Sequence, residues 1–234
     1  MRIDFGGRTV VVTGGTGALG RAVVRALLES GGRCVIPVYR EVEVEGVSWR
    51  DEDRVRLIPG IDLCDDKAVA ALFEEAARNG LWGSVHVCGG FAMAPIQQTA
   101  SDAFRRMFEL NALTAFACTR EASLRMSDGG RVVNVAARPA LFPELGGGMV
   151  AYAASKAAVA ALTQAAAAEL VGARVLVNAV APDVMDTPTN REAMPDADFS
   201  AWARVEDVAS TIAFLVSPQN SCTRGGLVPV YGRG

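Results

Sequence analysis

The sequence is poor in the side chains that most often carry chemistry. Only two of its 23 basic residues are lysines, Lys67 and Lys156, and it holds one histidine, His86. A metal site built from several histidines is therefore excluded, and a Ser-His-Asp triad would have to use His86. Tyrosines are also scarce, with three in the chain. If a lysine takes part in chemistry, there are two candidates.

Cysteines and long apolar runs are sparse as well. Five cysteines are scattered without Cys-x-x-Cys spacing, which favours reduced thiols in a cytoplasmic protein over a disulfide framework. No apolar stretch approaches the roughly 18 residues of a membrane span, and the start of the chain does not resemble a signal peptide. With a net charge of −3, we expect neither nucleic acid nor a membrane surface as a partner.

Half of the residues are hydrophobic, which is enough for a sizeable core. Short apolar runs alternate with longer segments that have apolar residues at helical spacing. We therefore expect one α/β domain over residues 1–234: a Rossmann-type, doubly wound parallel sheet with helices on both faces. The expected strands are 9–13, 33–38, 55–61, 85–88, 131–136, 174–180 and 227–230. The expected helices are 18–30, 65–79, 101–126 (one helix or a pair), 150–171 and 205–217.

The segment between the first expected strand and helix is rich in glycine. Residues 13–20 read Thr-Gly-Gly-Thr-Gly-Ala-Leu-Gly, so Gly15, Gly17 and Gly20 fit the pattern G-x-G-x-x-G. At a strand-to-helix junction, such glycines let the backbone approach a pyrophosphate at the helix N-terminus. A tight turn without a ligand is the alternative. The position of the pattern favours a dinucleotide site.

The end of the second expected strand bears on which dinucleotide is bound. NAD enzymes usually place an Asp or Glu there for the ribose hydroxyls, whereas residues 37–40 read Pro-Val-Tyr-Arg. Arg40 can pair with a 2′-phosphate, which favours NADP(H) over NAD(H); a solvated surface arginine is the alternative. Asp62, after the third expected strand, either accepts from an adenine amino group or caps the helix that begins near Asp65.

Tyr152 and Lys156 lie four residues apart on an expected helix and so share one face. A nearby ammonium favours the phenolate and lowers the pKa of a tyrosine. Such a tyrosine can give a proton to a developing alkoxide or take one from an alcohol. A surface pair on an alanine-rich helix is the alternative interpretation.

With these motifs, the chain resembles the short-chain dehydrogenase/reductase family over essentially its whole length. The matching motifs are the turn 13–20, Asp62, Asn111 within Glu-Leu-Asn-Ala, the strand 130–135 (Gly-Arg-Val-Val-Asn-Val), Tyr152-x-x-x-Lys156, and 178–182 (Asn-Ala-Val-Ala-Pro). The resemblance implies a single-domain Rossmann fold. It also implies a homotetramer or homodimer that packs through the helices near 101–126 and 150–171.

The resemblance further implies a role for each site residue. Tyr152 is the general acid/base, Lys156 binds the nicotinamide ribose and lowers the pKa of Tyr152, and Asn111 holds a water in a proton relay. Thr187 and the backbone of Val184 meet the nicotinamide carboxamide. The full cofactor set that it implies is Gly14, Gly15, Thr16, Gly17, Leu19, Arg40, Asp62, Leu63, Gly89, Gly90, Lys156, Pro182, Val184 and Thr187.

The sequence departs from the family at four places. Ala18 replaces the middle glycine of the turn, and we expect one methyl group near the phosphates to be tolerated. Val-Cys-Gly-Gly at 87–90 replaces Asn-Asn-Ala-Gly, and we interpret this change as structural. Asp183 follows Pro182 where glycine is usual, and either brings a charge near the nicotinamide or alters the loop. Ala137 takes the position of the catalytic serine. Loss of one such hydrogen-bond donor typically lowers a rate by roughly 10²–10³.

Three explanations of Ala137 stand side by side. The substrate needs less help, as an already polarised quinonoid or imine group would; the alanine is an engineered change; or the chain has left redox chemistry. In the third case it is a cofactor-binding scaffold, or an isomerase, cyclase or lyase that uses Tyr152. Arg138 either supplies the missing donor or is a loop arginine before Pro139, and we favour the loop arginine.

Two loops at the carboxyl ends of strands, 138–149 and 183–202, should frame a small-molecule substrate. Their Gly- and Pro-rich hinges indicate a lid that orders on binding. A small to medium apolar or aromatic carbonyl, imine or alcohol fits the expected lining: Phe91, Met93, Phe142, Met149, Met185 and Met194. We expect His86 to be buried without a catalytic role. Arg105 and Arg106 should lie on a solvated or interface face of a helix.

Overall fold

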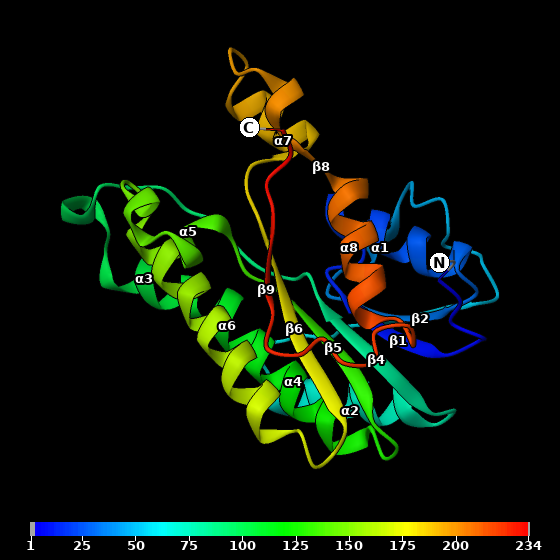
Figure 1. The fold of residues 1–234 in the computed structure, drawn as a ribbon. Helices are drawn as coiled ribbons and strands as arrows, with labels where there is room; N and C mark the ends of the chain where they lie inside the picture. The colour runs from blue at the N-terminus through cyan, green and yellow to red at the C-terminus, as the bar shows by residue number, and fades with distance from the viewer. Residues whose placement is uncertain (1–2, 234) are drawn as a thin grey trace.

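The main sheet carries seven parallel strands in the order β3-β2-β1-β4-β5-β6-β9 (Figure 1). The computed structural model describes residues 3–233. The strands are β1 (Thr9–Thr13), β2 (Arg33–Val38), β3 (Val55–Pro59), β4 (Leu81–His86), β5 (Gly130–Val135), β6 (Val175–Pro182) and β9 (Leu227–Val230). The central strands are valine-rich and buried, because helices cover both faces of a parallel sheet.

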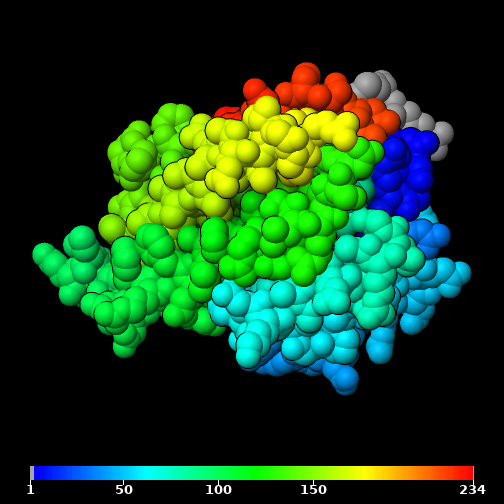
Figure 2. Space-filling view, turned by 90° about the horizontal axis from the view of Figure 1, so that it is seen from below, coloured from blue at the N-terminus to red at the C-terminus, as the bar shows by residue number. Residues whose placement is uncertain are grey.

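Eight helices surround the sheet in the described chain. They are α1 (Ala18–Glu29), α2 (Asp66–Ala77), α3 (Ser101–Phe108), α4 (Thr114–Arg125), α5 (Arg138–Leu141), α6 (Val150–Glu169), α7 (Pro188–Ala193) and α8 (Val205–Val216). Helices α1 and α8 pack together on one face of the sheet, and α2, α4 and α6 cover the other. Figure 2 views the molecule from below, where cyan, green and yellow residues lie side by side. No helix of residues 3–233 is long and apolar enough to cross a membrane.

The direction of winding reverses between β1 and β4, which are neighbours in the sheet but not in the sequence. At such a switch point the connections leave toward opposite faces, and a crevice opens at the carboxyl ends of the strands. The turn after β1 and the loop after β4 border this crevice. The sequence prediction of a doubly wound parallel sheet is therefore confirmed.

Several expected elements differ from the structure in their bounds, and β4 and the segment 101–126 differ most. Strand β4 begins at Leu81 rather than at residue 85, because Gly83 and Ser84 pair with β1 and with β5 in register. Gly83 lies so close to Val216 of α8 that a Cβ would lie 2.6 Å from its Cγ2. The segment expected as one helix or a pair over 101–126 is a pair, and a π-helical turn over Glu109–Leu113 separates α3 from α4.

The loops expected to frame the substrate contain short elements of their own. Helix α5 follows β5, while β7 (Met185–Asp186) and β8 (Ala203–Arg204) form a two-stranded sheet that encloses α7. The segment with α7 projects from the sheet (Figure 1). The chain end after β9 returns to the base of this segment, since Arg233 N donates to the carbonyl of Ala201 at 3.3 Å.

A buried polar chain ties α6 to the sheet. His86 of β4 lies beside Asn134 of β5, and its Nδ1 donates to Asn134 Oδ1 at 2.8 Å. Asn134 Nδ2 donates to Thr163 Oγ1 of α6 at 2.9 Å. Because Asn134 Oδ1 can only accept, the proton of His86 is on Nδ1, and Nε2 accepts from Ser84 Oγ at 2.8 Å. His86 is buried, as expected.

Candidate active site

The turn after β1 forms one wall of a cavity of about 450 Å³. Gly14 has a φ of +65°, and a Cβ there would lie 2.8 Å from the backbone nitrogen of Cys88, so only glycine fits. Gly17 is the N-cap of α1, with no side chain bonded to the free amides of the first turn. No acidic residue lies in that turn. The free amides and the helix dipole therefore fit a pyrophosphate.

A second cavity, of about 250 Å³, adjoins the first at Gly14, Thr16 and Cys88. It lies past the end of β2, where an adenosine would be placed relative to a pyrophosphate on the turn. Asp62 lines this cavity and does not cap a helix: its Oδ1 accepts from Cys64 N at 2.9 Å. The N-cap of α2 is Asp65, whose Oδ1 accepts from Lys67 N at 2.8 Å.

Arg40 lies past the end of β2, and its side chain is 72% exposed. Its Nε lies 3.7 Å from Glu43 Oε1, and Glu43, rather than Arg40, lines the second cavity. Arg106 also lines this cavity, although its side chain is 56% exposed and pairs with Glu109, so the expected solvated face is confirmed for it. Arg105 is exposed as well and pairs with Asp102. Sequence reasoning missed Glu43 and Arg106 because neither belongs to a recognisable motif.

Tyr152 and Lys156 project from α6 into the first cavity. Lys156 Nζ donates to the carbonyl of Val135 at 2.7 Å, and burial lowers the pKa of Lys156 to about 8. Burial raises the pKa of Tyr152 to about 12. The expected lowering of the pKa of Tyr152 is therefore not found in this structure. Desolvation dominates because the ammonium is directed at Val135.

Asn111 lies in the π-helical turn and is buried behind the cavity. Its Nδ2 donates to the carbonyl of Gly90 at 3.0 Å and to Ser155 Oγ at 2.9 Å, while its Oδ1 accepts from Gly90 N at 3.0 Å. A Cβ on Gly89 would lie 2.5 Å from Asn111 Oδ1. Asn111 therefore fixes the loop after β4 against α6. Single π-helical turns within α-helices are frequent at functional sites.

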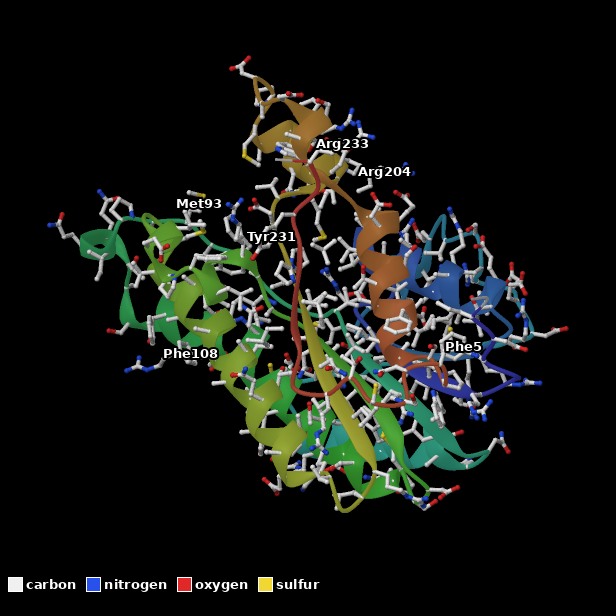
Figure 3. All side chains as sticks on the ribbon, in the orientation of Figure 1. Phe5, Met93, Phe108, Arg204, Tyr231 and Arg233 are labelled. Carbon is white, nitrogen blue, oxygen red and sulfur yellow. The ribbon has the colours of Figure 1, made fainter. Side chains whose placement is uncertain are left out.

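Ala137 lines the cavity and is 4% exposed, so its methyl group stands where a hydroxyl was expected from the family. Arg138 does not replace that donor. Its Nη1 donates to Asp183 Oδ2, and its Cζ stacks 4.8 Å from the centre of the Tyr231 ring. Figure 3 shows Tyr231 next to β9, between α5 and the segment that carries α7. Asp183 lines the cavity and brings a carboxylate to it.

The structure brings most of the predicted residues together, but not all of them. The predicted residues that line one or both cavities are Gly14, Thr16, Gly17, Leu19, Asp62, Leu63, Gly89, Gly90, Phe91, Ala137, Tyr152, Lys156, Pro182, Met185 and Thr187. Those that do not are Gly15, Arg40, Asn111, Val184, Met93, Phe142, Met149 and Met194.

Those outside the cavities have definite places. Gly15 packs against Ile36 of β2, where a Cβ would lie 2.8 Å from Cγ2, and the Val184 carbonyl accepts from Ala203 N. Met93, Phe142 and Met194 are exposed. These three residues and Met149 line neither cavity in this conformation, so their role as substrate wall stays a prediction. Cys88 lines both cavities and was missed, although it follows an expected strand.

The side chains of the described residues do not form a set of metal ligands. Within residues 3–233, no three His, Cys, Asp or Glu side chains are grouped so that they could hold a metal ion. The polar groups that the cavity does gather are a phenol, a buried ammonium and a carboxylate. These groups can transfer protons and bind a dinucleotide.

The comparisons with known proteins agree with this chemistry. A family model described as short chain dehydrogenase matches residues 8–198. The chain is 32% identical to cis-4-hydroxycyclohexanecarboxylate dehydrogenase of Sinomonas cyclohexanicum (97% of this chain, 96% of that one). It is 28% identical to the chloroplastic NADPH-dependent aldehyde reductase 2 of Arabidopsis thaliana (97% and 93%). A solved short-chain type dehydrogenase/reductase from Mycobacterium ulcerans superposes with a TM-score of 0.90 at 28% identity (99% and 90%).

Proposed function

This chain belongs to the short-chain dehydrogenase family, and on that premise we propose that it is an NADP(H)-dependent oxidoreductase of small to medium apolar or aromatic carbonyls, imines or alcohols. The nicotinamide, when bound, supplies or accepts the hydride. One observation carries the proposal: Tyr152 and Lys156 line the same cavity as the glycine-rich turn. A proton-transfer group therefore faces the place where a dinucleotide would end.

Tyr152 is the residue that we assign to proton transfer. With a pKa of about 12 it is protonated at neutral pH and can give its proton to the heteroatom of a substrate being reduced. Lys156, whose pKa is about 8, is still mostly charged at neutral pH. Its ammonium can bind ribose hydroxyls and stabilise the phenolate that Tyr152 leaves behind. Asn111 supports this pair through Ser155, the residue between them on α6.

NADP(H) is our proposed cofactor, with three supports. The side chain of Arg40 is exposed past the end of β2, no acidic residue ends β2, and a relative is named as NADPH-dependent. Glu43 opposes this preference, because its carboxylate lines the adenosine-side cavity and holds Arg40. The 2′-phosphate would have to draw Arg40 away from Glu43.

The substrate end of the cavity supports an apolar or aromatic substrate. Phe91 meets Tyr152 edge-on, with ring centres 4.9 Å apart, and Met185 adds a flexible apolar wall. The segment with α7 adjoins this wall, since Thr187 lines the cavity and caps α7 through Asn190 N. A lid hinged at 183–187 would close over a substrate placed there.

We further propose that the chain is one cofactor-binding domain that assembles into a homodimer or homotetramer in a reducing cytoplasm. The main sheet takes strands from both ends of the chain, and all five cysteines are free. An assembly is supported by large apolar side chains that α3, its π turn and α4 leave exposed: Phe104, Leu113, Phe116 and Leu124.

The experiment mixes the purified protein with NADPH and a panel of ketones, imines and quinones. Loss of the absorbance of reduced nicotinamide is the expected result, with a matched loss of rate in Tyr152→Phe. Lys67→Met serves as the control, because it removes the other lysine, which lines neither cavity. Tight binding of NADPH without turnover of any substrate would overturn the redox assignment.

A second candidate is favoured by Ala137 alone. With no donor at this position, Tyr152 can still move a proton in an isomerisation, cyclisation or elimination, or the cofactor can serve as a structural ligand. The same panel separates the two. A substrate that is consumed while NADPH stays constant supports the non-redox function.

A further inference from the structure

Two neighbouring strands set the polarity of the reacting end of the cavity. Ala137, after β5, presents a methyl group, and Asp183, after β6, presents a carboxylate. A carbonyl oxygen is activated by hydrogen-bond donors, and this wall has lost one. A protonated imine nitrogen is instead bound, and kept protonated, by an acceptor, and the same wall has gained one. The site has thus exchanged a donor for an acceptor.

Arg138 holds the carboxylate of Asp183 in place. Its guanidinium donates to Oδ2 and stacks over the Tyr231 ring, so the loop after β5, the loop after β6 and the chain after β9 are fixed together. The bond to Asp183 raises the pKa of Arg138. Oδ1 is left as an acceptor. The Arg138–Asp183 pair has no net charge, so it attracts a cationic ligand only weakly at long range. Its attraction for such a ligand comes mainly from a direct hydrogen bond to Oδ1 of Asp183.

The opposite wall is suited to a cation as well. Phe91 and Tyr152 form an edge-to-face pair, and both line the cavity. Aromatic faces attract a cation that loses water on binding, and the delocalised charge of an iminium ion spreads over such a surface. Lys156 is the cation already in the cavity, and its Nζ is bonded to the Val135 carbonyl. It does not neutralise the carboxylate from that position.

We propose that Asp183 accepts the N–H of a protonated imine, and that the enzyme reduces iminium ions to amines in preference to ketones. This inference rests on the proposed function, whose substrate class it names. The iminium carbon gains a hydride from the reduced nicotinamide, and the electron pair of the C=N π bond becomes the lone pair of a neutral amine. A neutral imine first takes its proton from Tyr152, which regains one from solvent. Ala137 is then no defect, because the reacting nitrogen needs no donor.

The first test compares two bicyclic substrates of similar size, 3,4-dihydroisoquinoline and 1-tetralone, with NADPH. We expect kcat/KM to favour the imine by about tenfold or more. Asp183→Asn should lower the imine-to-ketone ratio by about tenfold, and Ala137→Ser should shift it toward the ketone by a similar factor. Asp128→Asn is the matched control, since it breaks an exposed Arg–Asp pair, with Arg174, that lines neither cavity.

Arg138 acts through Asp183 in this account and is a positioning residue. Arg138→Met should lower the imine-to-ketone ratio, because the carboxylate is no longer held. Arg138→Lys should restore part of the ratio, since an ammonium can still pair with Oδ2. A merely structural role would instead lower both rates together and leave the ratio unchanged.

The second test needs no turnover. Calorimetry with the protein and NADP⁺ measures binding of protonated 1,2,3,4-tetrahydroisoquinoline and of neutral 1-tetralol. We expect the ammonium to bind about tenfold more tightly, and Asp183→Asn to remove the difference. Binding that Asp183→Asn leaves unaltered, or a ketone preference in the wild type, would overturn the inference. Asp183-dependent binding without turnover of either substrate would support the cation site and overturn the redox function.

Discussion

The stability of this protein should depend on pH through a single buried imidazole. His86 is bonded on both ring nitrogens, and burial lowers its pKa from 6.5 to about 4. As pH falls, the unfolded chain takes up this proton first, so acidification favours unfolding. The contribution of neutral His86 is complete above pH 6.5 and is lost between pH 6.5 and 4. At about 1.4 kcal/mol per unit of pKa shift, the loss is roughly 3 kcal/mol.

The assay is urea unfolding of the wild type and of His86→Gln at steps from neutral pH down to the acid end of this window. Glutamine can still donate an amide hydrogen to Asn134 but does not titrate. The difference in free energy of unfolding between the two proteins cancels the carboxylates, and His86 is the sole histidine. We expect this difference to shrink by roughly 3 kcal/mol toward acid. A difference in free energy of unfolding that stays constant with pH would show that His86 does not cause the acid destabilisation.

Three further predictions concern the cofactor, a helix cap and the lysine. Arg40→Ala should weaken NADPH much more than NADH in fluorescence titrations; equal effects on both would contradict a 2′-phosphate contact. Asp65→Ala should lower the free energy of unfolding by about 1 kcal/mol, since it removes the cap on Lys67 N, and an unchanged denaturation midpoint would show that the cap contributes nothing. The rate of reduction should fall as pH rises through about 8, where buried Lys156 loses its charge. A pH–rate profile that is flat there would exclude a role of the Lys156 ammonium in the reaction.

Secondary-structure elements were predicted correctly where the local sequence pattern agreed with the packing of the folded protein. The run Thr9–Thr13 is apolar enough to be a buried strand, and the glycine turn after it admits few other geometries. Strand β4 was assigned too short, since Gly83 and Ser84 have low strand propensity. They are strand residues because β1, β5 and α8 enclose them, which no local pattern reveals.

The site residues that belong to sequence motifs could be predicted. Tyr152, Lys156 and the turn were found because spacing along a helix or after a strand fixes their position. The group formed by Arg138, Asp183 and Tyr231 was not predictable. Its members lie 45 or more residues apart, and meet because β5, β6 and β9 are neighbours in the sheet. The pKa of Tyr152 was expected in the wrong direction, because burial is a property of the packed protein.

Hydride transfer in this cavity, with Tyr152 as the proton donor, is tested most directly by mass spectrometry of the product. The reaction uses NADPH with deuterium in place of both hydrogens at nicotinamide C4, with the wild type and with Tyr152→Phe. We expect transfer of deuterium to the substrate carbon in the wild type, and almost none in the variant despite normal NADPH binding. Product without deuterium, or equal transfer by the variant, would contradict it.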